Sequence, residues 1–245
     1  MSGRLAKLIA IAIRPRLWKA LASGVAPGVE HIPILKRLRI STLVDVGANK
    51  GQFSSIAKYV IPDVRIIAFE PLADAASRFR KLLSSPDVEL HRVALGSARA
   101  ERTLHVADRS DSSSLFPLSV NQTRAFGVKP VRTENVPVEI GADVVDVESL
   151  KRPILLKIDV QGGELSVLQG FENALHRIDY IYVELSYVPL YEGQPLAAEI
   201  VSYLARNGFM LAGVMNQVET SAFGMTQGDF LFRRHEGNGT ADPET

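Results

Sequence analysis

The sequence of 245 residues contains no cysteine. This absence excludes a disulfide framework, thiolate catalysis and any metal site built on cysteine sulfur, and it fits a reducing cytosol. Long apolar runs are scarce as well, since the first of them, residues 8–13, ends at Arg14-Pro15-Arg16. A secretory signal needs roughly 7–15 uninterrupted apolar residues and a membrane span about 20. We therefore expect a cytoplasmic protein without a membrane-spanning segment.

The signatures of two large enzyme classes are also missing. The sequence has no Gly-x-Ser-x-Gly elbow, which exposes the nucleophile of many hydrolases, and no P-loop lysine. Close histidine pairs are absent, and none of the five histidines is expected at the tip of a central strand: His31, His91, His105, His176 and His235. Hydrolase and kinase activities are therefore excluded, and each histidine is expected at a surface or core position.

Negative charge is scarce at the beginning of the chain, although the net charge is only +1. Residues 1–40 carry eight Lys and Arg side chains against Glu30 alone, so the remaining residues are mildly acidic. Apolar residues in this segment follow helical spacing and predict an amphipathic helix: Leu5, Leu8, Ile9, Ala12 and Ile13. This helix either packs on the domain or contacts anionic lipid through residues 4–19. A nucleic-acid partner is not expected, because no reader motif is present.

The sequence predicts three segments, namely a basic helical arm (1–39), a globular domain (40–233) and a polar, flexible tail (234–245). Within the domain, short apolar runs alternate with amphipathic runs, which is typical of a doubly wound α/β sheet covered on both faces by helices. The expected strands are 42–46, 64–69, 88–95, 154–159, 180–185, 209–215 and 229–232. The expected helices are 52–59, 73–83, 164–175 and 196–206. The linker 216–228 is too short for a crossover helix, so the last two strands should pair antiparallel.

Two segments lie outside this alternation. Residues 102–107 predict an additional strand after a turn at Gly96-Ser97. Residues 108–135 show little periodicity and are rich in serine, which predicts a long loop facing the substrate.

A turn between the first two strands predicts a nucleoside-binding site. Gly47 and Gly51 bracket a polar turn after the first strand and permit a sharp bend close to a ligand. Glu70 ends the second strand and can accept two hydrogen bonds from a ribose diol. Asp45 either braces the turn through backbone amides or faces the positive end of the ligand. The glycine spacing differs from the G-x-G-x-x-G of nicotinamide and flavin sites, which argues against a pyrophosphate ligand.

A second set of polar residues follows the fourth strand. Lys157 and Asp159 are two residues apart and so face the same side of the sheet. Asp159 can orient a substrate, accept a hydroxyl proton, or share a divalent cation with Glu164 or Glu184, and it can equally well balance a helix dipole. The spacing of these oxygen ligands does not require a metal.

Taken together, the motifs resemble those of the FkbM family of S-adenosylmethionine-dependent methyltransferases. The resemblance runs from about residue 40 to residue 233 and rests on these segments, among others: Val44-Asp-Val-Gly-Ala-Asn-Lys-Gly51, Ala68-Phe-Glu-Pro71, Leu156-Lys-Ile-Asp-Val-Gln-Gly162 and Gly228-Asp-Phe-Leu-Phe232. It implies a class I methyltransferase fold, mostly parallel with an antiparallel C-terminal strand. It also implies that S-adenosylmethionine contacts the residues of the glycine turn, Glu70 and the end of the third strand: Asp45, Gly47, Ala48, Asn49, Gly51, Glu70, Ala94 and Leu95.

The resemblance further implies O-methylation of sugars or polyketides. We expect Asp159 to accept the acceptor's proton and Glu184 to orient the acceptor, with Lys157 as a third catalytic candidate. Asp159 is followed by Val-Gln-Gly and not by the Pro-Pro-aromatic sequence that enzymes methylating amino groups of nucleic acids have at this place, so methylation of bases is not expected. Gly163 stands where the family often has a larger residue, which opens the acceptor side.

The favoured acceptor is a 6-deoxyhexose, fucosyl or rhamnosyl, of a bacterial lipo-oligosaccharide, as in the 2-O-methylated fucose of nodulation factors. An acylated acceptor would place the enzyme at the inner membrane face. A nicotinamide-dependent oxidoreductase and a non-enzymatic scaffold are the alternatives. The sequence does not indicate the oligomeric state.

Overall fold

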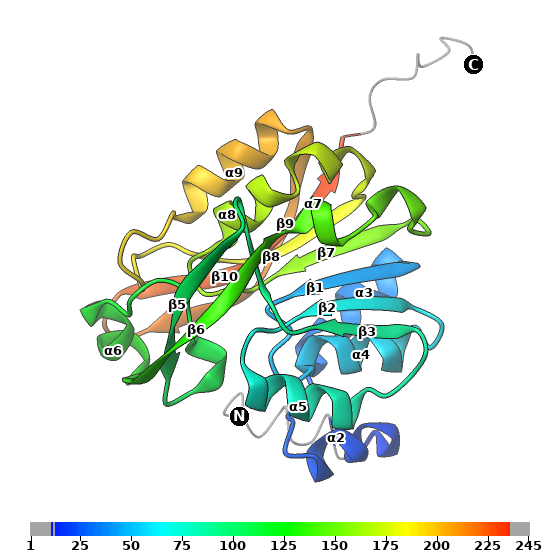
Figure 1. The fold of residues 1–245 in the computed structure, drawn as a ribbon, viewed down its shortest axis with the longest axis horizontal. Helices are drawn as coiled ribbons and strands as arrows, with labels where there is room; N and C mark the ends of the chain where they lie inside the picture. Colours follow the sequence, from blue (N-terminus) through cyan, green and yellow to red (C-terminus); the bar gives the residue numbers. More distant parts are fainter. Residues whose placement is uncertain (1–10, 12, 236–245) are drawn as a thin grey trace.

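The computed structural model describes residue 11 and residues 13–235, and its centre is a seven-stranded sheet (Figure 1). The strands are arranged in the order β3-β2-β1-β7-β8-β10-β9. All neighbours pair in parallel except β10, which is antiparallel to both β8 and β9. This is the class I methyltransferase arrangement, as predicted. The bounds are β1 (Thr42–Val46), β2 (Arg65–Phe69), β3 (Val88–His91), β7 (Ile154–Ile158), β8 (Tyr180–Ser186), β9 (Phe209–Thr220) and β10 (Gly224–Arg234).

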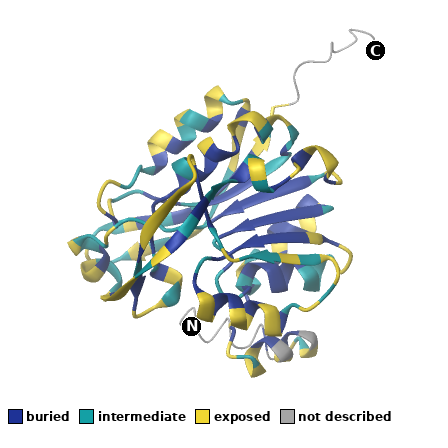
Figure 2. Cartoon of the chain, viewed as in Figure 1, coloured by how far each residue is buried: buried dark blue, intermediate teal, exposed yellow. Residues whose placement is uncertain are grey.

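Helices cover both faces of this sheet, so the domain has three layers (Figure 1). One face packs against α3 (Ile32–Leu38), α4 (Gln52–Val60) and α5 (Ala73–Leu82). The other packs against α7 (Gly141–Val144), α8 (Glu164–Gly170) and α9 (Ala197–Arg206). Side chains alternate along each strand, so Leu43 enters the first core and Val44 the second. The central strands are consequently buried along their length (Figure 2).

A second sheet of three strands is the main departure from the prediction. The expected strand 88–95 ends at His91, and the chain then forms β4 (Ala94–Gly96), which pairs with β6 (Pro130–Ile140). The expected strand 102–107 is confirmed as β5 (Ala100–Ala107), which pairs antiparallel with β6. The prediction of a loop over residues 108–135 is therefore wrong at its end. The first residues of β6 are exposed in succession, so no alternating pattern marks them as a strand.

The remainder of that segment contains a 3-10 turn (Ser110–Ser112) and a helix, α6 (Val120–Phe126). The Ser119 side chain accepts the amide of Asn121 and so caps the start of α6. Two other predicted boundaries change. The expected helix 164–175 is divided into α8 and a 3-10 segment (Glu172–Arg177), and the expected linker 216–228 is mostly strand, because β9 and β10 form one long hairpin.

Part of the N-terminal segment packs against the domain. It contains two short pieces, Pro15–Leu17 in 3-10 form and α2 (Trp18–Ala22), followed by another 3-10 turn (Val29–His31) and α3. Leu17 is buried in the same core as α3, whereas Ile13 is exposed. Leu5, Leu8, Ile9 and Ala12 of the predicted amphipathic helix lie outside the described residues, as does the tail from residue 236. Among the helices that are described, none combines the length and apolar character that crossing a membrane requires.

Candidate functional site

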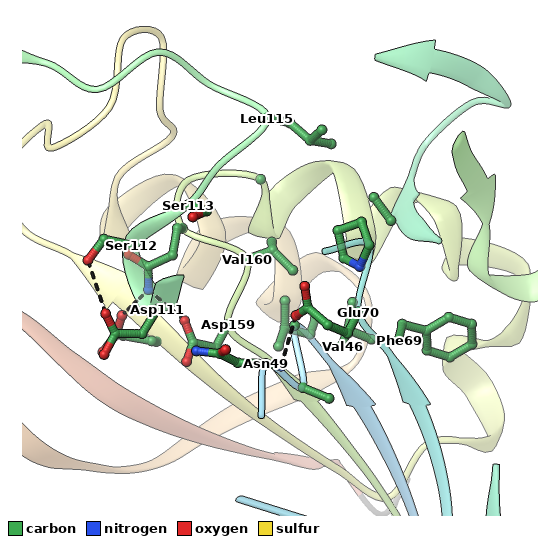
Figure 3. A pocket seen from close by; sticks show the side chains of 18 of the residues that line it. Val46, Asn49, Phe69, Glu70, Asp111, Ser112, Ser113, Leu115, Asp159 and Val160 are labelled. Atoms are coloured by element: carbon green, nitrogen blue, oxygen red, sulfur yellow. Dashed lines mark hydrogen bonds between the residues drawn. The ribbon is translucent and has the colours of Figure 1, made fainter. Parts of the chain in front are cut away.

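A cavity of about 550 Å³ opens where β1, β2, β7 and β8 end, and Figure 3 shows it from close by. In parallel sheets this edge is where ligands bind, because the loops that follow the strands diverge there. Of the eleven residues predicted for the site, nine line the cavity: Gly47, Ala48, Asn49, Glu70, Ala94, Leu95, Lys157, Asp159 and Glu184. The structure therefore brings the two predicted sets of polar residues to a single site.

Glu70 lies directly after β2 and is only 6% exposed. Its Oε2 accepts a hydrogen bond from the Asn49 amide at 2.9 Å, shown dashed in Figure 3, and its Oε1 accepts one from the Leu72 amide at 2.8 Å. Burial raises the pKa of Glu70 to about 7, although both amide bonds act in the opposite direction. A carboxyl oxygen has more than one lone pair, so both oxygens retain acceptor capacity toward the cavity.

The two glycines of the predicted turn lie in different surroundings. Gly47 has φ +77°, and a Cβ there would lie 1.9 Å from the carbonyl oxygen of Asp159. The bare backbone is therefore needed for packing between the loops after β1 and β7, and Gly47 also lines the cavity. Gly51, with φ +89°, precedes α4 and faces Phe79. It does not line the cavity, so the prediction of direct cofactor contact at Gly51 is corrected.

Asp45 also lies behind the cavity wall. Its carboxylate is fully buried, accepts a hydrogen bond from the Ser54 hydroxyl at 2.6 Å and has Lys157 Nζ 3.2 Å from Oδ1. These partners are side chains of α4 and β7, whereas the prediction gave Asp45 a bond to the turn amides or to the ligand. The reason is that Asp45 pairs in register with Lys157 across β1 and β7, which places both side chains on one face.

Lys157 connects the two strand tips. Its ammonium donates to the Gly47 carbonyl at 3.1 Å and lies 3.7 Å from Asp159 Oδ2. Burial alone would lower the pKa of Lys157, but Asp45 and Asp159 outweigh it and raise the pKa to about 12. The lysine is thus a fixed positive charge, and it cannot act as a proton acceptor near neutral pH.

The opposite end of the cavity carries three carboxylates. Asp159 follows β7, Glu184 lies on β8, and Asp229 lies on β10 directly opposite Glu184 in the strand register. Burial, then Asp159 and Asp229, raise the pKa of Glu184 well above its ordinary value. Asp229 accepts hydrogen bonds from the Tyr182 hydroxyl at 2.9 Å and from Asn216 at 2.8 Å, and burial raises its pKa too.

Several residues at this end were missed by the sequence analysis: His31, Gln161, Tyr182, Asn216 and Asp229 all line the cavity. His31 lies 3.8 Å from Asp229 through Nδ1, although the two are almost two hundred positions apart in sequence. Asp229 lies in the family-like segment 228–232. The expectation that this strand pairs antiparallel in the sheet was the signal that could have placed Asp229 near Glu184.

Glu164 does not face the cavity. Its Oε1 accepts the amides of Gly162 at 2.9 Å and Val160 at 3.3 Å, so it braces the loop after β7 from the first turn of α8. Burial raises the pKa of Glu164 to about 7. Within residues 13–235 the acidic and histidine side chains form no group of three placed to hold a metal ion.

A short segment closes the cavity on the side of the second sheet. All residues of the segment 110–116, here termed the cover segment, line the site except Ser114, and the side chains of Asp111, Ser112, Ser113 and Leu115 are drawn in Figure 3. Ser110 donates to the Asn49 side chain at 3.3 Å, and the Ser112 carbonyl accepts from Tyr191 at 3.0 Å. The segment is therefore tied to the turn after β1 and to the buried Tyr191, and it lies within the loop predicted to face the substrate.

Residues 45–211 match the sequence model of the family described as "Methyltransferase FkbM domain". The chain belongs to this family. It is 31% identical to Methyltransferase 1 of Beauveria bassiana, over 59% of this chain and 64% of that protein. It is 27% identical to the 2-O-methyltransferase NoeI of Sinorhizobium fredii, over 64% of this chain and 68% of that protein. It is 29% identical to the hexuronic acid methyltransferase AglP of Haloferax volcanii, over 58% of this chain and 55% of that protein. Each match thus spans little more than half to two thirds of the relative's length.

The family implies S-adenosylmethionine as cofactor, and the cavity fits it. Its volume lies within the range of roughly 300–1,000 Å³ that is usual for small-molecule sites. Glu70 offers a ribose diol two acceptor oxygens fixed by backbone amides, and Ala94 and Leu95 supply apolar surface for a base. The groups that a nucleoside requires are therefore present, namely a fixed carboxylate directly after β2 and an apolar surface on β4.

Proposed function

We propose that the protein is an S-adenosylmethionine-dependent O-methyltransferase that acts on a hydroxyl group of a sugar. One observation carries the proposal: a single cavity has a nucleoside-type carboxylate, Glu70, at one end and the carboxylates of Asp159 and Glu184 at the other. Membership of the methyltransferase FkbM family supports the same conclusion. A nicotinamide-dependent oxidoreductase would have a different glycine spacing and lack the final antiparallel strand pair.

When bound, the cofactor supplies an activated methyl group on a sulfonium centre, which leaves as a neutral thioether. The protein's task is then mainly to position an acceptor oxygen in line with that group. Glu70 would hold the ribose, and Ala48, Asn49, Ala94 and Leu95 would line the nucleoside end. Lys157 would hold the turn after β1 in place through the Gly47 carbonyl.

A base must also accept the hydroxyl proton as the new bond forms. Asp159 suits this role because its side chain lines the cavity and is 36% exposed. Burial and the neighbouring carboxylates Asp159 and Asp229 raise the pKa of Glu184, which favours its protonated form. In its protonated form Glu184 can instead donate to a second hydroxyl of the sugar, which would orient the ring.

The acceptor that we propose is a neutral sugar, with a fucosyl or rhamnosyl 6-deoxyhexose of a bacterial lipo-oligosaccharide as the first candidate. Three acidic side chains, Asp159, Glu184 and Asp229, line this end of the cavity, which favours a neutral ring over an anionic one. One relative is named a 2-O-methyltransferase and another a hexuronic acid methyltransferase, so transfer of a methyl group to oxygen and a sugar-type acceptor both occur among the relatives' names. An acylated acceptor would bring the enzyme to the inner membrane face, where residues 4–19 could contact anionic lipid.

Comparison of surface and secreted glycans from cells with and without the protein tests this proposal. Mass spectrometry should show one deoxysugar that gains the mass of a single CH₂ unit only when the active protein is present. A methyl group that appears on a uronic acid or on a polyketide instead would contradict the proposed acceptor. Unchanged methylation of every glycan and lipid fraction would contradict the proposed function.

A further inference from the structure

Gln161 lies between the two catalytic candidates, in the loop that follows β7. Its side-chain Nε2 donates to Asp159 Oδ1 at 2.6 Å and to Glu184 Oε2 at 2.9 Å. Its Oε1 accepts a hydrogen bond from the Tyr191 hydroxyl at 2.8 Å. Only this orientation of the amide is chemically consistent, because carboxylates accept hydrogen bonds and the amide NH₂ group is the donor.

Tyr191 fixes the other end of this amide. Its side chain is almost fully buried, and its hydroxyl also lies 3.0 Å from the Ser112 carbonyl in the cover segment. The Gln122 side chain donates to the same hydroxyl at 3.0 Å. The single hydroxyl proton of Tyr191 thus lies within hydrogen-bond distance of two acceptors, Gln161 Oε1 and the Ser112 carbonyl, while the hydroxyl oxygen accepts from Gln122. The position of Gln161 is therefore linked to the segment that covers the cavity.

The backbone at Gln161 has an unfavourable conformation that supports the same interpretation. Its φ is +59°, a region that glycine and asparagine tolerate much better than glutamine. Among non-glycine residues that the structure describes, four have positive φ, and three of these line the cavity: Asn49, Gln161 and Asn216. Such conformations persist where the surrounding structure holds them, and they concentrate at functional sites.

We propose that Gln161 is a positioning residue that holds Asp159 and Glu184 in a fixed relation and presents their remaining oxygens to the acceptor. The inference rests on the proposed function. Two carboxylates close together repel each other, and a neutral amide with two N–H groups can bond to one oxygen of each. Gln161 engages Asp159 Oδ1 and Glu184 Oε2, so the hydroxyl groups of a sugar would bond to Glu184 Oε1 and to Asp159 Oδ2, which also lies 3.7 Å from Lys157 Nζ.

The charged or titratable groups that interact with this pair come from several elements: Lys157 on β7, Glu164 on α8, Tyr191 after β8 and Asp229 on β10. A second group of side chains contacts these in turn: Asp45 on β1 lies against Lys157, and Tyr182 on β8 and His31 before α3 lie against Asp229. Burial, Asp159 and Asp229 raise the pKa of Glu184, and the bond from Gln161 lowers it. Loss of that bond should therefore raise the pKa of Glu184 further.

The test uses Gln161→Met, which keeps an unbranched side chain of similar length but removes the amide. With a glycoside that the wild-type protein methylates, we expect kcat to fall by about 10²-fold, since small errors in position are costly in such reactions. Affinity for S-adenosylhomocysteine, measured by calorimetry, should stay within about twofold because Gln161 bonds at the acceptor end. Tyr191→Phe should change kcat in the same direction and by less.

A carboxyl titration followed by ¹³C NMR gives a second readout that does not depend on any acceptor. The resonance of Glu184 should titrate at higher pH in Gln161→Met than in the wild type. Thr42→Val is the matched control, because it removes a buried hydrogen bond of 2.8 Å to the Lys151 carbonyl at the far end of β1. It should lower stability without changing kcat or the Glu184 titration.

Two outcomes would overturn the inference. One is an unchanged kcat and an unchanged Glu184 titration in Gln161→Met. The other is a fall in the affinity for S-adenosylhomocysteine as large as the fall in kcat, which would show that Gln161 supports the whole site rather than the carboxylate pair. Failure of the proposed function is distinguishable, because the wild-type protein would then methylate no glycoside while the NMR result would still decide the role of Gln161.

Discussion

Four carboxyl groups around one cavity differ in what surrounds them, and these surroundings determine what each can do. Glu70 and Glu164 are buried against backbone amides, and burial raises the pKa of each to about 7. Glu70 faces the cavity and Glu164 does not, so only Glu70 can contact a ligand. Asp159 and Glu184 share the amide of Gln161 at the acceptor end. Under the proposed function, residues of one chemical type would thus serve as ligand contact, as brace of a loop and as reacting group.

Asp159→Asn tests the assignment of the base. The amide keeps the size of the side chain but cannot accept the hydroxyl proton, so turnover should fall by about 10²-fold or more. Affinity for S-adenosylhomocysteine should be nearly unchanged, since Asp159 lies at the other end of the cavity. Steady-state kinetics and calorimetry measure the two quantities, and an unchanged turnover would remove Asp159 from the mechanism.

Nucleoside affinity should depend on pH through Glu70. Because burial raises the pKa of Glu70 to about 7, the carboxyl is mostly protonated at pH 5 and mostly ionised at pH 8. The ionised form accepts both hydrogen bonds of a ribose diol, so affinity should increase as the pH rises through 7. The dissociation constant of S-adenosylhomocysteine should be at least about tenfold larger at pH 5 than at pH 8.

Glu70→Gln is the control for this prediction, because an amide does not titrate. Its affinity should be weaker at pH 8 and nearly independent of pH. If the wild-type protein shows the same affinity at both values of pH, then Glu70 does not contact the ligand as a carboxylate.

At the scale of elements, the loops after β1 and β7 form one unit. Gly47 contacts the carbonyl of Asp159 so closely that no side chain fits, and Lys157 donates to the carbonyl of Gly47. The cover segment then links this unit to the second sheet, with which it shares the pair His105–Ser114. The position of Asp159 is therefore set by the backbone of the neighbouring loop as well as by its own strand.

Gly47→Ala should consequently destabilise the protein by several kcal/mol, because it adds a steric overlap to the cost of a positive φ. Gly127→Ala is the matched control, since Gly127 has φ +71° but no atom within 4 Å of an added Cβ. It should cost only about 1–2 kcal/mol, the cost of the left-handed conformation alone. Urea denaturation measures both free energies of unfolding, and equal losses would contradict the packing account.

At the scale of the whole molecule, the central strands and the helices that cover them were predictable, because the order of apolar and polar residues in each segment matches the spacing of its buried side chains. Thr42–Val46 and Arg65–Phe69 are short, apolar and followed by glycine or acidic residues, which marks their carboxyl ends. The second sheet was not predictable, because the first half of β6 is exposed and shows no alternation. The predicted end of the strand 88–95 was wrong for a related reason. Residues 94–96 are buried like a continuation of the strand, but they form β4, which pairs with β6 in the second sheet.

The site was predictable where its residues follow strand tips and not where distant segments meet. Glu70 and Asp159 come directly after strands, so their place could be inferred from position alone. His31 and Asp229 lie outside the matched segment 45–211, and their proximity depends on how the N-terminal helices and the final hairpin pack. Gln161 belongs to the family-like segment 156–162, but its hydrogen bonds to both carboxylates depend on a backbone conformation that no pattern of residue types encodes.

Calorimetric titration of the wild-type protein with S-adenosylhomocysteine and with NAD tests the central claim most directly. The claim is that the cavity between the tips of β1, β2 and β7 holds an adenosyl sulfonium cofactor. We predict saturable binding of S-adenosylhomocysteine with one site per chain and no heat of binding with NAD. Binding of NAD, or no binding of S-adenosylhomocysteine at pH 8, would contradict it.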